Sequence, residues 1–189
     1  YSGQLHPKPR TCDDWEITLF PTSCVYDGTA QKPDVTVWVG EEKVPAQYYR
    51  VTYENNNAVG EGAVVVTGLE PYQGTVRRSF AIQFAKPKLS GLENSKSGVT
   101  VTWKTVAGAA GYLVERKQGD EEWQLVKTVK GGKITRWMDS SNRNGERYGY
   151  RVRAYSGDYT SKASTAKSIT YLTAPKLSKL KNTGKRAVT

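Results

Sequence analysis

Two cysteines and one histidine are the residues of this 189-residue chain whose types most readily do chemistry. Cys12 and Cys24 lie 12 positions apart, and either a disulfide or two buried free thiols would account for them. Together with His6 they offer at most three metal ligands at irregular spacing, so the sequence predicts no metal site. His6 lies among prolines in segment 5–9, where no fixed partner is available to make it a general base.

The motifs of common catalytic and cofactor sites are missing from the sequence. It contains no P-loop, no glycine-rich dinucleotide fingerprint, no calcium loop of the Asp-x-Asp-x-Asp-Gly type and no Asn-x-Ser/Thr acceptor. No apolar run is long enough to span a membrane as a helix. The sequence therefore predicts a protein that is not an enzyme and holds no cofactor.

A row of arginines is the remaining candidate for chemistry. Arg147, Arg151 and Arg153 fall on one face of a strand if Tyr148 and its alternate neighbours point into a core. Such a face would attract a polyanion, such as a wall polymer or an acidic glycan. The alternative is an ordinary solvated sheet face. Nucleic acid is not expected as a partner, because no nucleic-acid-binding signature is present.

Exposed aromatic rings would offer a second kind of site. Sugars stack on flat rings, but β-sandwiches also use tryptophan and tyrosine in their cores and in cross-strand pairs. Core or pairing use is the preferred interpretation. The candidates not assigned to a core are Trp38, Tyr48, Trp123, Trp137 and Tyr159.

The elements that must position these residues are predicted to be β-strands. Apolar residues alternate with polar ones over most of the chain, as at Val35, Val37 and Val39 and again from Tyr148 to Ala154. Glycine, asparagine and aspartate separate these runs, and no amphipathic helix is evident. The sequence predicts an all-β protein.

The charge distribution predicts a domain boundary near residue 85. The chain has a net charge of +10, but residues 1–85 carry 7 basic and 10 acidic side chains, whereas residues 86–189 carry 21 basic and 8 acidic ones. The shift coincides with Ala85, Lys86 and Pro87, and proline interrupts regular elements.

An internal repeat predicts a second boundary. Residues 87–95 (PKLSGLENS) match residues 175–183 (PKLSKLKNT) at an offset of 88 positions, which is the length of a domain rather than of a solenoid unit. We therefore expect residues 86–173 to be one module and residues 174–189 to be the first strand of a further copy, in a chain cut from a longer array. Residues 1–12 are expected to be a leader or linker.

Residues 86–173 resemble a fibronectin type III domain. The resemblance rests on VTVTW at 99–103, GAAGYLV at 108–114 and YGYRVRA at 148–154. It implies that Trp103 lies in the core between two sheets and that Tyr148 forms the tyrosine corner of such domains.

Residues 13–85 resemble a bacterial immunoglobulin-like repeat of Gram-positive surface proteins. The motifs are YDGTA at 26–30, Tyr53 with Asn55 and Asn56, and the glycines around 60–74. The two resemblances together imply two immunoglobulin-like β-sandwiches in tandem, in an extracellular, secreted or surface-attached protein. In that oxidising compartment, the resemblance favours a disulfide between Cys12 and Cys24.

The same resemblance implies a function. We expect a monomeric, non-catalytic spacer segment whose partners are the neighbouring domains of its parent chain. The alternative is an adhesion module, in which the basic face of the second domain binds a cell-wall polymer, a host glycan or a host protein.

Overall fold

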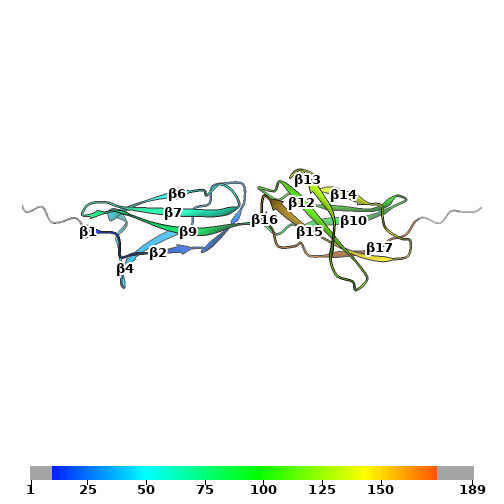
Figure 1. Ribbon diagram of the computed structural model, residues 1–189, viewed down its shortest axis with the longest axis horizontal. Coiled ribbons are helices and arrows are strands. Elements are labelled where there is room, and N and C mark those ends of the chain that lie inside the picture. Colours follow the sequence, from blue (N-terminus) through cyan, green and yellow to red (C-terminus); the bar gives the residue numbers. More distant parts are fainter. Residues whose placement is uncertain (1–9, 174–189) are drawn as a thin grey trace, which may run out of the picture.

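The computed structural model describes residues 10–173 and is almost entirely β-structure. Two β-rich units follow one another along the long axis of the molecule (Figure 1). Each unit has its own pair of sheets and its own hydrophobic core. The predicted all-β fold, with two β-sandwiches in tandem, is confirmed. The predicted leader up to residue 9 and the predicted further strand at 174–189 lie outside the described residues.

The first unit contains two sheets and one short strand pair. The four-stranded sheet has the order β3-β9-β7-β6, with bounds Ser23–Tyr26, Thr75–Phe84, Gly60–Gly68 and Tyr49–Glu54. The three-stranded sheet has the order β2-β4-β5, with bounds Trp15–Phe20, Asp34–Val39 and Glu42–Lys43. A 3-10 turn, η1 (Ala46–Tyr48), precedes β6.

The start of the described chain belongs to this first unit. Strand β1 (Arg10–Thr11) pairs in parallel with β8 (Tyr72–Gln73), and the backbone N–H of Cys12 donates to the carbonyl of Gln73 at 3.1 Å. The three residues from Arg10 to Cys12 therefore pack with the sandwich, although the sequence placed them in the leader.

Alternation of side chains builds the core of the first unit. In β2, Trp15 and Ile17 are buried whereas Glu16 and Thr18 are exposed, as a half-buried strand requires. The facing sheet contributes apolar residues from β7 and β9. The largest buried members of this core are Trp15, Ile17, Val37, Val64, Val66, Phe80 and Ile82.

The predicted disulfide between Cys12 and Cys24 is wrong. Both residues are buried free cysteines. Cys12 lies against Gly68 at one end of β7, whereas Cys24 pairs across the sheet with Ile82, which in turn pairs with Gly60 at the other end of β7. Eight residues of strand separate those ends, or about 26 Å. A disulfide requires Cα atoms within about 7 Å.

The second unit also contains two sheets. One has the order β10-β11-β14, with bounds Leu89–Ser95, Gly98–Trp103 and Arg136–Asp139. The other has the order β13-β12-β15-β16, with bounds Gln124–Lys130, Gly111–Gln118, Arg147–Ser156 and Tyr159–Thr160. Strand β17 (Lys167–Thr170) pairs with the first half of β15.

The core of the second unit lies between these sheets and is rich in tyrosine. Trp103 packs against Tyr112, with ring centroids 5.4 Å apart. The hydroxyl of Tyr112 donates to the carbonyl of Gly132 at 2.9 Å and accepts the N–H of Val106 at 3.0 Å. A buried phenol is tolerated because its polar end is hydrogen-bonded.

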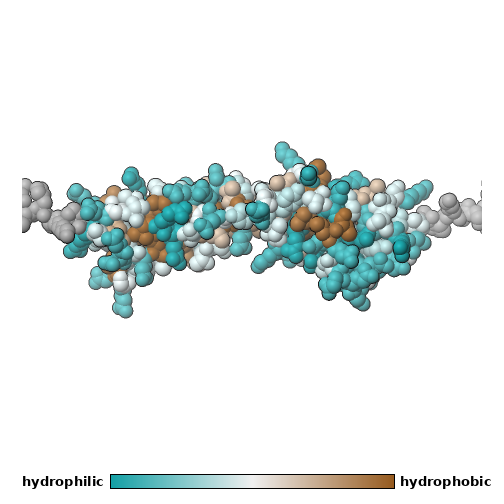
Figure 2. All heavy atoms as spheres, in the orientation of Figure 1, coloured by the Kyte–Doolittle hydropathy of each residue, from teal (hydrophilic) through white to brown (hydrophobic). Residues whose placement is uncertain are grey.

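Most of the surface is hydrophilic. In Figure 2, teal side chains cover much of the visible face, and smaller hydrophobic patches interrupt them over both units. Within residues 10–173, no helix has the length and apolar character needed to cross a membrane.

Candidate functional site

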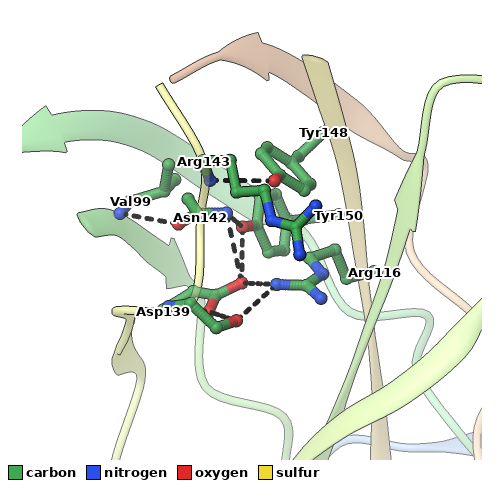
Figure 3. Close-up of polar contacts among 8 residues, drawn as sticks. Val99, Arg116, Asp139, Asn142, Arg143, Tyr148 and Tyr150 are labelled. Atoms are coloured by element: carbon green, nitrogen blue, oxygen red, sulfur yellow. Dashed lines mark hydrogen bonds and ion pairs between the residues drawn. The ribbon is translucent and has the colours of Figure 1, made fainter. Parts of the chain in front are cut away.

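A cluster of hydrogen-bonded polar side chains in the second unit brings together an aspartate, an arginine and a tyrosine (Figure 3). Asp139, at the end of β14, lies at its centre and is only 2% exposed. Arg116 comes from β12 and Tyr150 from β15, both in the opposite sheet. Asn142 comes from the loop after β14. The cluster therefore connects the two sheets.

The carboxylate of Asp139 accepts hydrogen bonds on both oxygens. Its Oδ2 receives Arg116 Nη1 at 2.7 Å and the hydroxyl of Tyr150 at 2.8 Å. Its Oδ1 receives the backbone N–H and the hydroxyl of Ser141 at 3.0 and 2.7 Å. Asn142 connects the cluster to strand β11, because its side-chain oxygen accepts the N–H of Val99 at 3.1 Å.

These contacts determine the charge state of the cluster. Burial acts to raise the pKa of Asp139, but hydrogen bonds from Ser141, Tyr150 and Arg116 outweigh it and leave the pKa below its ordinary value. Burial likewise raises the pKa of Tyr150, with the hydrogen bond to Asp139 acting in the same direction. The cluster thus holds an ionised carboxylate beside a neutral phenol and a guanidinium.

The cluster is closed to a substrate. Catalytic acids and bases must reach a reacting group, but Asp139 is almost completely buried and both of its oxygens already accept hydrogen bonds. Strand β11 also approaches closely: a Cβ on Gly98, whose φ is +141°, would collide with the carbonyl oxygen of Asp139. We interpret the cluster as a structural joint between the sheets.

Two residues singled out from the sequence lie beside this joint or in the same core. The hydroxyl of Tyr148 accepts the backbone N–H of Arg143 at 2.9 Å, which is the contact of a tyrosine corner. The guanidinium of Arg116 lies 5.1 Å from the centre of the Tyr148 ring. Trp103 is 3% exposed within the core.

The arginine row occupies one face of β15 but is partly neutralised. Arg151 and Arg153 both donate to the carboxylate of Glu115 on β12, Arg153 at 3.2 Å. The Arg151 guanidinium also lies 4.4 Å from the centre of the Trp123 ring. Arg147 is exposed and forms no ion pair within the described part of the chain. Three arginines therefore present less free charge than their spacing alone predicts.

The candidate sugar-stacking aromatics are spread over both units. Trp38 donates its indole N–H to Thr18 at 3.1 Å, and Tyr48 packs edge-on against Tyr72. Trp137 packs against the second core. Tyr159 is the most exposed of them, at 52%. The structure does not bring these rings together into one platform.

The junction between the units is a set of contacts that the sequence did not reveal. Strand β9 ends at Phe84 and β10 begins at Leu89, so four residues connect the units. Phe84, although it belongs to β9, is buried in the core of the second unit. Apolar residues from both units therefore meet at this short connection.

Two glycines allow close approach at this junction. A Cβ on Gly60 of the first unit would lie 3.4 Å from the Tyr159 ring of the second. A Cβ on Gly108 of the second unit would lie 2.9 Å from the Tyr26 ring of the first, and its φ of +75° also favours glycine. Each unit thus places a tyrosine against a glycine of the other.

Comparison with known proteins gives likeness of fold only. No family model matches the chain, and no curated protein matches it. A two-domain fibronectin type III segment of chicken tenascin is similar with a TM-score of 0.59 and 14% identity, over 82% of this chain and 97% of that one.

Two further solved structures are weaker matches. Titin domains A168–A170 match with a TM-score of 0.38 and 17% identity, over 85% of this chain and 66% of theirs. A β-1,2-glucanase from Parabacteroides distasonis matches with a TM-score of 0.44 and 15% identity, over 59% of this chain. This chain covers only 18% of the glucanase. The tenascin match supports a fold of the fibronectin type III kind, a β-sandwich.

Proposed function

We propose that residues 10–173 are a non-catalytic, semi-rigid spacer in a secreted or cell-surface multidomain protein. The observation that carries the proposal is the junction, where a four-residue connection and the buried side chain of Phe84 join the two cores. A short connection with apolar packing limits the relative motion of two domains, whereas a flexible linker would not.

The polar cluster supports this proposal over a catalytic one. A fold of this class hosts many functions, so function has to be argued from a site. The polar cluster around Asp139 is sealed by its own hydrogen bonds. Its contacts stabilise the sandwich instead of leaving a carboxylate open to a substrate.

The arginine face supports the alternative, an adhesion module, less well. Glu115 balances part of the charge of Arg151 and Arg153. Arginines that are partly buried and paired in this way offer little free charge to attract a distant polyanion.

A distance measurement tests the rigidity of the spacer. Lys43 follows the β4–β5 turn and Lys96 lies in the β10–β11 turn, both exposed and both at the ends far from the junction. Spin labels on Lys43→Cys and Lys96→Cys should give one narrow distance distribution. The wild-type protein, treated with the same label, measures the background from the two buried native thiols. Insertion of Gly-Gly-Ser-Gly-Gly after Ala85 should broaden the distance distribution. Equal widths in the two proteins would contradict the proposal.

The extracellular location rests on the resemblance to surface repeats and needs a test of its own. Antibodies against residues 10–173 should bind intact cells of the producing organism, or protein in its medium. Binding confined to permeabilised cells would rule out this part of the proposal.

A further inference from the structure

A groove lined by lysines lies at the start of strands β10 and β17 of the second unit. It lies where β10, an edge strand of one sheet, faces β17 of the other. The groove has a volume of about 420 Å³. Its lining residues are Lys86, Pro87, Lys88, Leu89, Thr165 and Lys167.

No carboxylate lines this groove, and its three lysines are exposed. Lys86 Nζ donates to the hydroxyl of Thr165 at 3.3 Å, and Lys167 Nζ donates to the carbonyl of Ser90 at 2.9 Å. These neutral partners orient the ammonium groups without cancelling their charge. None of the three lysines is in an ion pair within residues 10–173.

The positive charge continues beyond the groove. Lys86 also lines the neighbouring hollow at the junction, which contains Lys162 and likewise no acidic residue. Because Lys86 lines both hollows, the four lysines are spread over two adjacent hollows and do not line a single pocket. Clustered like charges repel one another, and a bound anion would relieve that repulsion.

We propose that this lysine groove binds a linear polyanion that carries phosphate groups. A lysine ammonium is a compact point charge with three rotatable donors, which suits tetrahedral phosphate oxygens at variable angles. Ammonium groups spread over two adjacent hollows match successive phosphates of an extended chain better than one small anion. The groove is a different surface from the arginine face, where Glu115 already neutralises charge.

Binding of inorganic polyphosphate at 150 mM NaCl tests the proposal. The variant Lys86→Gln/Lys88→Gln/Lys167→Gln should bind about tenfold more weakly than the wild-type protein. The slope of log affinity against log salt should fall by about 2, because each lost phosphate contact removes ~0.7–0.9 from it. The matched control is Lys127→Gln/Lys130→Gln/Lys133→Gln, which removes the same charge from exposed positions on and after β13.

The control variant distinguishes binding at the groove from general attraction to the net positive charge of the protein. The proposal is supported if the groove variant loses polyphosphate binding and the control variant binds nearly as well as the wild-type protein. Equal loss in both variants, or no binding by the wild-type protein, would overturn it. Heparin provides the second arm: loss of heparin binding with unchanged polyphosphate binding would show that the groove takes sulfated chains and would overturn the phosphate assignment. None of these outcomes depends on whether the segment is a rigid spacer.

Discussion

At the scale of single residues, Asp139 joins the two sheets of the second unit. One buried carboxylate collects donors from β12, β15 and the loop after β14. Such a group is a source of stability only while every partner is present, because a buried charge without its counter-charge is costly. The same residue therefore makes the unit sensitive to acid.

The prediction for Asp139→Asn follows from this buried ion pair. The substitution keeps the size of the side chain but leaves Arg116, whose side chain is 21% exposed, without its counter-charge. We expect the free energy of unfolding at pH 7 to fall by about 3 kcal/mol. Urea denaturation measures it, with exposed Asp120→Asn as the control.

The pH dependence has a definite sign. The pKa of Asp139 is lower in the folded protein than its ordinary value of 3.8. Its stabilisation is therefore fully present above the ordinary value and is lost as the pH falls through the lower folded pKa. The wild-type protein should lose stability as the pH falls below the ordinary value of 3.8, and Asp139→Asn should lose less over the same acid range. Parallel curves for the two proteins would refute the assignment.

Residue types alone could predict the buried aromatic residues of the second unit but not its buried ion pair. Trp103 and Tyr148 stand in alternating apolar runs, so their burial was predictable from the pattern. Asp139 and Arg116 are 23 positions apart in sequence and belong to no recognisable motif. Their pairing depends on how β14 lies across from β12, which only the packed sandwich determines.

At the scale of elements, alternation predicted the long strands and missed the short ones. Runs such as Val35 to Val39 and Tyr148 to Ala154 fall inside β4 and β15. Strands of two residues, such as β1, β5, β8 and β16, are too short to show a period. Strands β5 and β16 form because longer neighbouring strands present free backbone groups, whereas β1 and β8 pair with each other.

Strand direction also determines that the two cysteines lie too far apart to form a disulfide. The chain runs from Cys12 through β2 and β3 toward the junction, so the two thiols end at opposite ends of the first unit. Burial raises the pKa of both thiols, which slows their reaction in the folded protein.

The register therefore predicts two free thiols. In denaturant and without reductant, alkylation should modify both Cys12 and Cys24, whereas the folded protein should react slowly. The measurement is intact mass before and after alkylation. A chain that takes up no label until reductant is added would show that a disulfide exists.

At the scale of the whole molecule, the side chain of Phe84 is one of the contacts that link the two units. Phe84 leaves the first unit at the end of β9 and is buried among residues of the second core. The sequence predicted a boundary near residue 85 from charge and proline, but charge carries no information on whether side chains cross that boundary.

Phe84→Ala should weaken the second unit. Removal of a buried phenyl ring leaves a cavity and costs about 3 kcal/mol of unfolding free energy. Phe84 is 7% exposed, whereas Phe20, in the same unit, is 77% exposed, so Phe20→Ala should change stability little. Urea denaturation of both variants makes the comparison. If the two substitutions cost the same, Phe84 does not belong to the second core as described.

The parallel pairing of β3 with β9 has a mechanical consequence for the first unit. Four residue pairs, from Ser23–Ala81 to Tyr26–Phe84, lie in register with both strands running toward the junction. Tension that enters from the N-terminal side and leaves through β9 pulls these strands in opposite directions along their length. The hydrogen bonds of this ladder would then be strained together, in shear, instead of opening one after another. A tether built this way resists extension through its backbone geometry.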